Sequence, residues 1–175
     1  MTRAFKRQGE TIRMQLEPVE VELLHSVRDG LRESLLGGDH DDPIVRRLFP
    51  TAVSGDEQAD HELRRLLYDD LLQARLVGLE ELTSLLDRGV EHRGHLRVRL
   101  TAEEAALVLG VINDLRLAIG ARIGIEDLER DDVDPEDPVA YRLAVMDHLA
   151  WLQEQLLAVL DPASVAHYGG ADDDA

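Results

Sequence analysis

The residues best suited to do chemistry are polar side chains inside a segment that is otherwise built for burial. Residues 107–119 are mainly apolar, but they include Asn113, Asp114 and Arg116. A buried charge costs free energy unless it is paired and hydrogen-bonded, so these side chains need polar partners from another helix. The predicted polar core cluster consists of Arg64, Arg65, Asp69, Asp70, Asn113, Asp114 and Arg116.

This polar core cluster has two interpretations, and the sequence leaves both open. Convergent polar groups in an apolar helical core are typical of a pocket for a small molecule, which could also be an enzyme site. Alternatively, the same side chains form a hydrogen-bonded network that fixes the register of the helices. No nucleophile motif or phosphate-binding glycine loop accompanies the cluster, so it specifies no reaction.

Basic residues gather in two segments that are predicted to contain strands. Residues 3–13 and 91–99 together carry seven arginines and lysines but only two glutamates. If the two strands pair, they place a positive patch on a protein whose net charge is −17. Such a patch suits an acidic partner, whereas the alternative is an ordinary solvated strand face. The candidate partner-binding basic face consists of Arg7, Arg13, Arg97 and Arg99.

Other patterns that could bind a metal or perform catalysis are weak. His92 and His95 are three positions apart, but no carboxylate or cysteine stands at a defined spacing from them. The acidic residues 126–137 lack the central glycine and final glutamate of a calcium-binding EF-hand loop. Asp147 and His148 have no nucleophile in a recognisable setting. We therefore predict no catalytic residues, no metal and no cofactor.

Composition excludes several classes of function. The chain has 175 residues and no cysteine, which excludes disulfides, thiolate metal sites and thiol switches. The net negative charge argues against nucleic-acid binding, because phosphate contacts need cationic surface. The longest apolar run, Ala105–Ile112, is far too short to span a bilayer. We therefore expect a cytoplasmic protein that does not enter membranes.

One segment of the chain resembles another segment 84 positions later. Residues 12–36 align with residues 96–120 without a gap, and seven of the aligned pairs are identical. Each copy has the pattern of a short alternating strand followed by a helix, and Thr101 and Glu104 form a capping box in the second copy. The pattern indicates a strand–helix duplication, although two amphipathic helices with similar starts could also align by chance.

These elements predict an all-α fold, a helical bundle of about four main helices with a small β element from residues near 4–16 and 95–100. The helix over residues 101–123 is apolar on nearly every side and is expected at the centre. We predict one helical domain over residues 1–165 and a disordered acidic tail over residues 166–175. The long leucine-rich helix has enough apolar surface to pack against a second copy of the chain, so the sequence is compatible with a homodimer. The main helices are predicted over residues 17–36, 56–88, 101–123 and 138–160, with a short helix after Pro43.

Several motifs resemble a family of proteins of unknown function from actinomycetes. The resemblance covers residues 3–160, and Asn113-Asp114-Leu115-Arg116-Leu117 is its most specific part. The other motifs are Asp42-Pro43, Arg47-Leu48-Phe49-Pro50, Glu62-Leu63-Arg64-Arg65-Leu66, Asp69-Asp70-Leu71, Gly120-Ala121-Arg122-Ile123-Gly124 and Trp151-Leu152-Gln153-Glu154.

The family is typically encoded near the ClpS-type protease adaptor, and it includes an oxidative stress regulator that acts on transcription through a protein partner. That regulator senses oxidation with a cysteine pair. Because this chain has no cysteine, the resemblance implies the partner-binding role without the thiol trigger.

The sequence thus favours a non-enzymatic cytoplasmic regulator that acts by protein–protein interaction, in stress-linked transcription or proteolysis. The alternative is a helical small-molecule-binding protein or enzyme that uses the polar core cluster.

Overall fold

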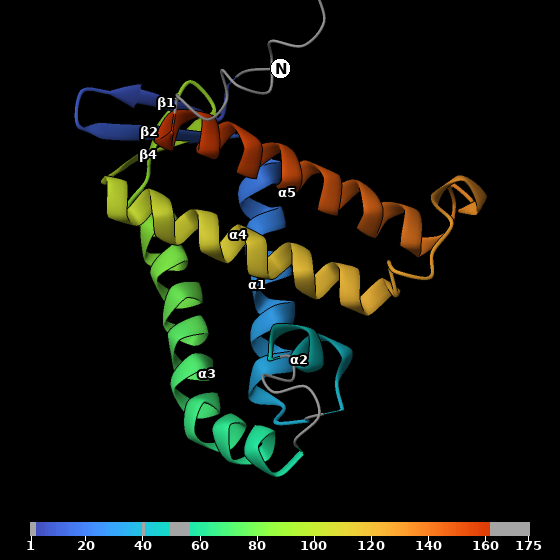
Figure 1. Cartoon of the computed structure of the whole chain (residues 1–175). Helices are drawn as coiled ribbons and strands as arrows, with labels where there is room; N and C mark the ends of the chain where they lie inside the picture. The colour runs from blue at the N-terminus through green and yellow to red at the C-terminus, as the bar shows by residue number, and fades with distance from the viewer. Residues whose placement is uncertain (1–2, 40, 50–56, 162–175) are drawn as a thin grey trace, which may run out of the picture.

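The structure is a computed structural model that describes residues 3–39, 41–49 and 57–161, and for residues 57–67 it describes the backbone alone. Each of two strand pairs is followed by a group of helices along the chain (Figure 1). In order they are β1 (Phe5–Gln8), β2 (Thr11–Leu16), α1 (Pro18–Leu36), α2 (Pro43–Leu48), α3 (Glu57–Asp87), β3 (Val90–His92), β4 (His95–Leu100), α4 (Ala102–Ile123), the 3₁₀ turn η1 (Arg130–Asp132) and α5 (Pro138–Leu160).

The strands form one antiparallel sheet in the order β1-β2-β4-β3. Side chains alternate between its two faces. On the inner face Ile12, Met14 and Leu16 of β2 lie beside Val98 and Leu100 of β4, and all five are buried. The expected pairing of the two repeat strands is therefore confirmed.

The strand pairing of the two hairpins is symmetric about the centre of the β2–β4 pair. Met14 pairs directly with Val98, and these residues are also equivalent under the 84-residue offset. The equivalence extends outward, because β1 pairs with β2 as β3 pairs with β4. The hairpins β1–β2 and β3–β4 thus occupy matching positions in the sheet, and each is followed by a helix. We call β1–β2–α1 the first unit and β3–β4–α4 the second unit.

The helix starts also match between the two units. Glu20 accepts a hydrogen bond from the backbone N–H of Glu17 at 2.7 Å, and Glu104 accepts one from the N–H of Thr101 at 2.8 Å. Both contacts belong to capping boxes, which satisfy backbone donors that a helix start leaves free. At α2 and α5 the N-cap residue itself supplies the acceptor: the carboxylates of Asp42 and Asp137 accept from the backbone N–H of Ile44 and Val139, each at 2.8 Å.

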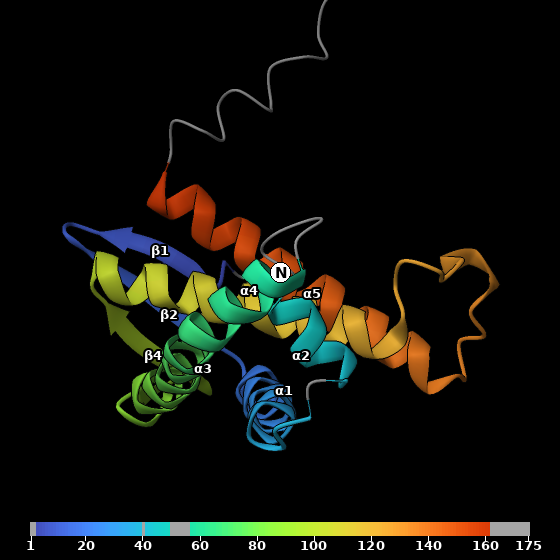
Figure 2. The same cartoon turned by 60° about the horizontal axis from the view of Figure 1, so that its bottom comes forward.

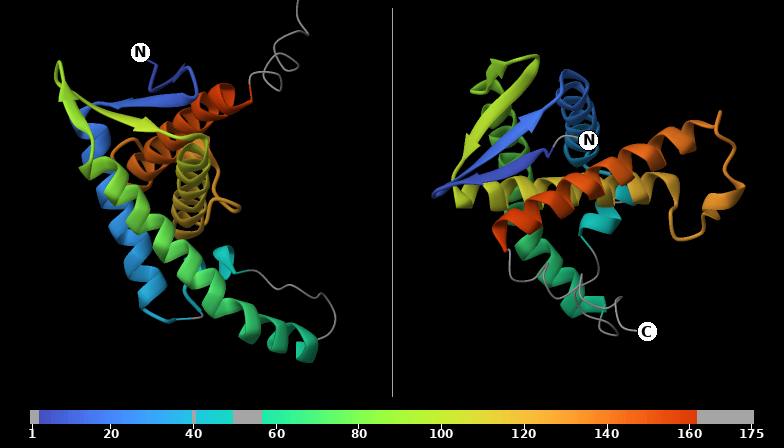
Figure 3. Two further views of the ribbon diagram at one scale, coloured as in Figure 1. Left: turned by 90° about the vertical axis from the view of Figure 1, so that its left-hand side faces the viewer. Right: turned by 90° about the horizontal axis from the view of Figure 1, so that it is seen from above.

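Helix α4 lies at the centre of the molecule. It contacts the sheet and every other α-helix of the described chain. Helices α4 and α5 run side by side, while α2 lies against the C-terminal half of α4 (Figures 1 and 2). Helices α1 and α3 descend together from beneath the sheet (Figure 3, left). The expectation that residues 101–123 form the central helix is confirmed.

The predicted all-α class is wrong, because the protein is a mixed α/β fold with a four-stranded sheet. The predicted β element, from residues near 4–16 and 95–100, does not include residues 90–92. These residues form β3, which pairs Val90 with Arg97 and His92 with His95. Gly94, at φ 78°, turns the chain between the two strands, a conformation that glycine adopts without steric cost. The predicted tail at residues 166–175 lies outside the described residues.

Candidate basic docking face on the sheet

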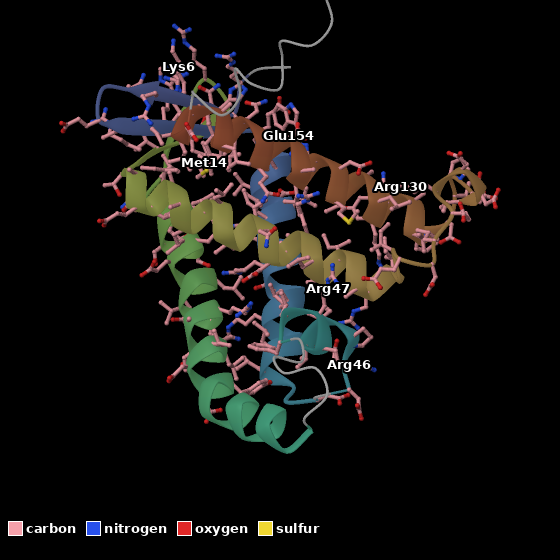
Figure 4. The ribbon with its side chains drawn as sticks, in the orientation of Figure 1. Lys6, Met14, Arg46, Arg47, Arg130 and Glu154 are labelled. Atoms are coloured by element: carbon pink, nitrogen blue, oxygen red, sulfur yellow. The ribbon has the colours of Figure 1, made fainter. Side chains whose placement is uncertain are left out.

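The outer face of the sheet carries four cationic side chains, which we call the basic sheet face: Lys6, Arg13, Arg97 and Arg99. Lys6 of β1 pairs with Arg13 of β2, and Arg13 pairs with Arg99 of β4. Three cations therefore stand in one row across three strands. In Figure 4, Lys6 extends away from the helices while Met14 lies on the helix side of the sheet.

This arrangement is electrostatically unfavourable in the isolated protein. Like charges directly opposite each other in neighbouring strands destabilise a sheet. Within the described part of the chain, no carboxylate forms an ion pair with Lys6, Arg13, Arg97 or Arg99. The positive charge of this face also acts on the nearby His92, because Arg97 is the main cause that lowers the pKa of the His92 imidazole. An anion placed against this face would relieve the repulsion.

A hollow of about 510 Å³ lies beside the row, and Arg13, Arg97 and Arg99 all line it. Arg97 donates from Nε to the side chain of Gln15 at 2.9 Å, which holds its guanidinium over the sheet. The Nε of Arg13 is buried and has no hydrogen-bond acceptor. Arginine guanidinium groups favour carboxylate and phosphate groups, so the hollow is suited to an anionic group of a partner.

Arg7, the fourth predicted member of the basic face, lies on the other side of the sheet. It pairs with the buried Ile12, and its Nη2 donates to the carbonyl oxygen of Val159 at 2.8 Å. That carbonyl belongs to the last turn of α5, where cations are stabilised by the helix dipole. Arg7 therefore tethers the end of α5 to β1, and Lys6 takes its place in the basic row.

The predicted polar core cluster does not converge on one site. Asp114 faces α3, where its Oδ2 lies 3.4 Å from the Nε of Arg75. Burial raises the pKa of the Asp114 carboxyl, and the charge of Arg75 acts in the opposite direction. Arg75 in turn donates to the carbonyl of Leu48 and lies over the ring of Phe49. This group joins α2, α3 and α4, as expected of a structural network.

Two of the remaining members, Asn113 and Arg116, line one cleft that is bounded by α2, α4 and α5. Arg116 faces α5 and donates to the side chain of Gln153, while Asn113 is exposed. Asp69 and Asp70 are exposed on α3. The side chains of Arg64 and Arg65 lie outside the described residues.

Two other features bear on the site. Across the described ranges, no three histidine, cysteine, aspartate or glutamate side chains gather as a metal site would require. No helix in the part of the chain that the structure describes has the length and apolar character needed to cross a membrane.

The predicted site residues omit Lys6 and Arg75, although Lys6 lies in a basic segment and Arg75 near the middle of the long helix, and the sequence carries a signal for Lys6 alone. Alternation along residues 5–8 places Lys6 on the face opposite Phe5, which is buried. The helical period separates Asp114 from Arg116 by about 200°, so the two could not face one pocket. Arg75 was near the middle of the long helix but had no feature in the sequence to mark it as the partner of Asp114.

Comparisons with known proteins identify relatives in mycobacteria. The chain is 32% identical over 132 residues to the oxidative stress regulator AosR of Mycobacterium tuberculosis, which covers 68% of this chain and 58% of that protein. The same values hold for AosR of Mycobacterium bovis. The putative oxidative stress regulator AosR of Mycobacterium leprae is 31% identical over 130 residues, 69% of this chain and 59% of its own. The chain thus spans less than two thirds of the length of these relatives.

No solved structure matches the chain. A family model described as a domain of unknown function, DUF2017, matches residues 2–160. That match takes in both strand–helix units, α2, α3 and α5, and the protein therefore belongs to the DUF2017 family.

Proposed function

We propose that this protein is a non-enzymatic regulator that acts by binding an acidic segment of a partner protein through its basic sheet face. The observation that supports this proposal most directly is the row of Lys6, Arg13 and Arg99, in which like charges face one another across three strands. A protein with a net charge of −17 carries ample carboxylate to neutralise this row, yet none of its described carboxylates pairs with it. The repulsion is relieved when a partner supplies the anionic groups.

The chemistry of the face favours protein over nucleic acid as the partner. A short acidic segment can lie within the hollow beside Arg13 and Arg97, where the cations are close together. A long polyanion would extend past the sheet and meet the negative remainder of the protein, which repels it. Electrostatic complementarity of this kind mainly sets the rate of association and the choice of partner.

The proposed role in stress-linked regulation rests on the relatives. The mycobacterial proteins are named oxidative stress regulators, and we extend the regulatory role, in transcription or proteolysis, to this chain. Because this chain has no cysteine, its regulation would not use a thiol switch. A cytoplasmic location belongs to the same proposal.

The proposal is tested by affinity capture from a lysate of the native cells after nuclease treatment. Wild type is compared with Arg97→Glu/Arg99→Glu, which reverses two charges on the basic sheet face. The matched control is Arg32→Glu/Arg142→Glu, which makes the same charge change at two exposed arginines on α1 and α5. Thermal unfolding of each variant confirms that it is folded.

We expect wild type and the control to retain the same protein, and the sheet variant to lose it. Binding of the purified partner should weaken as salt rises, because the contacts are between exposed charges. The proposal fails if wild type retains no specific protein or if the sheet variant retains the same protein as wild type. It also fails if nuclease treatment removes the interaction, since the partner would then be a nucleic acid.

A further inference from the structure

A second cleft lies at the other end of the molecule, away from the sheet. It has a volume of about 660 Å³ and is bounded by α2, the C-terminal half of α4, the turn after α4, and α5. This volume is in the range of pockets that hold small molecules. Asn113, Arg116 and Gly120 line it from α4, where their spacing places them along one face of the helix, and Gly124 lines it from the C-cap that follows.

The cleft has an apolar wall and a polar edge. Leu117 and Ala121 of α4, Ile125 of the following turn and Met146 of α5 form the wall. Gly120 keeps this wall close-packed, because a Cβ there would lie 3.2 Å from Ile125 and 3.7 Å from the sulfur of Met146. An apolar wall beside a few polar groups is typical of a site in which the wall provides affinity and the polar groups set orientation.

Three arginines line the polar edge. Arg46 and Arg47 come from α2 (Figure 4), and Arg116 comes from α4. Arg47 is 3.1 Å from the carboxylate of Glu126, so this charge is already paired. Arg46 and Arg116 have no ion pair with any described carboxylate. Asp127 also lines the cleft, which leaves an excess of one positive charge at this edge.

Arg116 brings a partly buried positive charge to the cleft. Its guanidinium is partly buried and gives one hydrogen bond to Gln153, but its Nε is buried without any acceptor. A buried donor that lacks an acceptor is costly, and more so when it is charged. The equivalent residue in the first unit, Arg32, is exposed to solvent on α1 and meets no such cost.

We propose that this cleft binds a small organic anion, with its carboxylate or phosphate group against Arg116 and Arg46 and its apolar body against Leu117, Ile125 and Met146. The anionic group supplies a counter-charge for Arg46 and Arg116, neither of which forms an ion pair with a described carboxylate. The apolar body covers the wall formed by α4 and α5. This site is separate from the basic sheet face and does not depend on the function proposed for that face.

The test uses phenyl phosphate as the probe and the methionine methyl groups as reporters. The chain has three methionines, Met1, Met14 and Met146. Met146 lines the cleft, whereas Met14 is buried beneath the sheet. In ¹³C-methyl-methionine NMR, phenyl phosphate should shift the Met146 signal in a saturable way, with a dissociation constant of about 1 mM or tighter, and should leave Met14 unchanged. Met146→Leu assigns the signal.

Variants locate the anionic contact. Arg46→Gln and Arg116→Gln should each weaken the binding of phenyl phosphate by about ten-fold or more, while Arg32→Gln, the matched control from the first unit, should bind as wild type does. Because Arg46 is exposed, its substitution does not threaten folding. Benzyl alcohol, which keeps the ring but lacks the charge, and inorganic phosphate, which lacks the ring, should both bind more weakly than phenyl phosphate.

The proposal is overturned if Met146 does not shift at about 10 mM phenyl phosphate, roughly ten times the expected dissociation constant. It is equally overturned if Arg46→Gln and Arg116→Gln bind phenyl phosphate as wild type does. Equal binding of benzyl alcohol and phenyl phosphate would show that the charge plays no part. Loss of binding in Arg97→Gln/Arg99→Gln would place the site on the sheet instead and would also contradict the proposal.

Discussion

The two strand–helix units begin alike and differ in what surrounds their helices. Strands β2 and β4 pair around the equivalent residues Met14 and Val98, and both helices begin with a capping box. Helix α1 packs against its neighbours over part of its surface, whereas α4 is covered by the sheet and by α1, α2, α3 and α5. The strand pairing and the helix starts match, but the environments of the two helix bodies do not.

Two pairs of equivalent positions show what this difference does. Arg32 on α1 is exposed, while Arg116 on α4 is partly buried and lines a cleft. Gly30 on α1 corresponds to Asp114 on α4, which forms an ion pair with Arg75. At these positions α1 has an exposed arginine and a glycine, whereas α4 has two charged side chains that are partly buried. The surroundings of the helix, rather than its own start signals, decide which arginine can contact a ligand.

The largest expected effect tests the shared part of the two units. Leu16 and Leu100 are equivalent residues at the ends of β2 and β4, and both have 0% of their surface exposed. We expect Leu16→Ala and Leu100→Ala each to lower the free energy of unfolding by about 2–5 kcal/mol, because each leaves a cavity in the core. Denaturant unfolding measures both. Losses that differ by more than about 2 kcal/mol would show that the two strands do not share one core equally.

The next effect concerns the capping boxes. Glu104 bonds to both Nη atoms of Arg88, each at 2.8 Å, as well as to the N–H of Thr101. We expect Glu104→Gln to lower the free energy of unfolding by about 1 kcal/mol at neutral pH. Glu20→Gln removes the equivalent charge at the start of α1, where Glu20 lies 2.9 Å from the Nε2 of His148, and serves as the comparison. An unchanged stability for Glu104→Gln would refute a role for this contact.

The same contact predicts a pH dependence. The hydrogen bond from Arg88 is the main cause that lowers the pKa of the Glu104 carboxyl. The stability that Glu104 contributes is therefore present above its unfolded pKa and is lost as pH falls through its lower folded pKa. The difference between wild type and Glu104→Gln should shrink on acidification. Thermal unfolding at a series of pH values measures it, and a difference that grows would contradict this assignment.

A smaller effect isolates the repulsion on the basic sheet face. Arg13→Glu should raise the free energy of unfolding by about 0.2–1 kcal/mol, because the new carboxylate faces Lys6 and Arg99 across the strands. Adding Arg99→Glu to Arg13→Glu again places like charges opposite each other and should remove the gain. Arg32→Glu serves as a control with the same charge change outside the sheet. A loss of stability in Arg13→Glu would mean that the row is not repulsive in the free protein.

The smallest effect concerns Asp114, where burial and Arg75 act on the carboxyl in opposite directions. The pKa of Asp114 is raised in the folded state, so the folded state binds this proton more readily than the unfolded state does. Burying the charged carboxylate costs free energy, and this cost disappears as pH falls through the raised pKa. Wild type should gain stability relative to Asp114→Asn over this interval. Unfolding of both proteins between neutral pH and pH about 4, near the pKa of an unperturbed aspartate, measures the change. A shift in favour of Asp114→Asn would be the wrong sign.

Local signals in the sequence predict some elements well and others poorly. The alternation at residues 11–16 and the capping box at Thr101 are short-range patterns, so the strand β2 and the start of α4 follow from neighbouring residues alone. Residues 90–92 carry no such pattern, and they become a strand only because β4 supplies hydrogen-bond partners. The predicted β element therefore lacked one strand, and the all-α class was wrong because the four-stranded sheet makes the fold mixed α/β.

The candidate sites divide in the same way. Once the two repeat segments pair, strand alternation places Arg13, Arg97 and Arg99 on the same face of the sheet. The position of Arg7 against the end of α5 involves a contact between residues 152 positions apart, which no local pattern reveals. The predicted convergence of Asp114 and Arg116 overlooked the helical period, which turns the two side chains toward α3 and α5 respectively.

The sequence by itself determined the charge of the protein, the absence of thiol chemistry, the two strand–helix segments and the signals that start their helices. These are properties of composition or of residues within a few positions of one another. Only the tertiary structure decided that Arg32 is exposed while Arg116 lines a cleft, and that the row on the sheet has no carboxylate partner among the described residues. Burial and charge pairing depend on residues far apart in the chain, and packing alone brings those residues together.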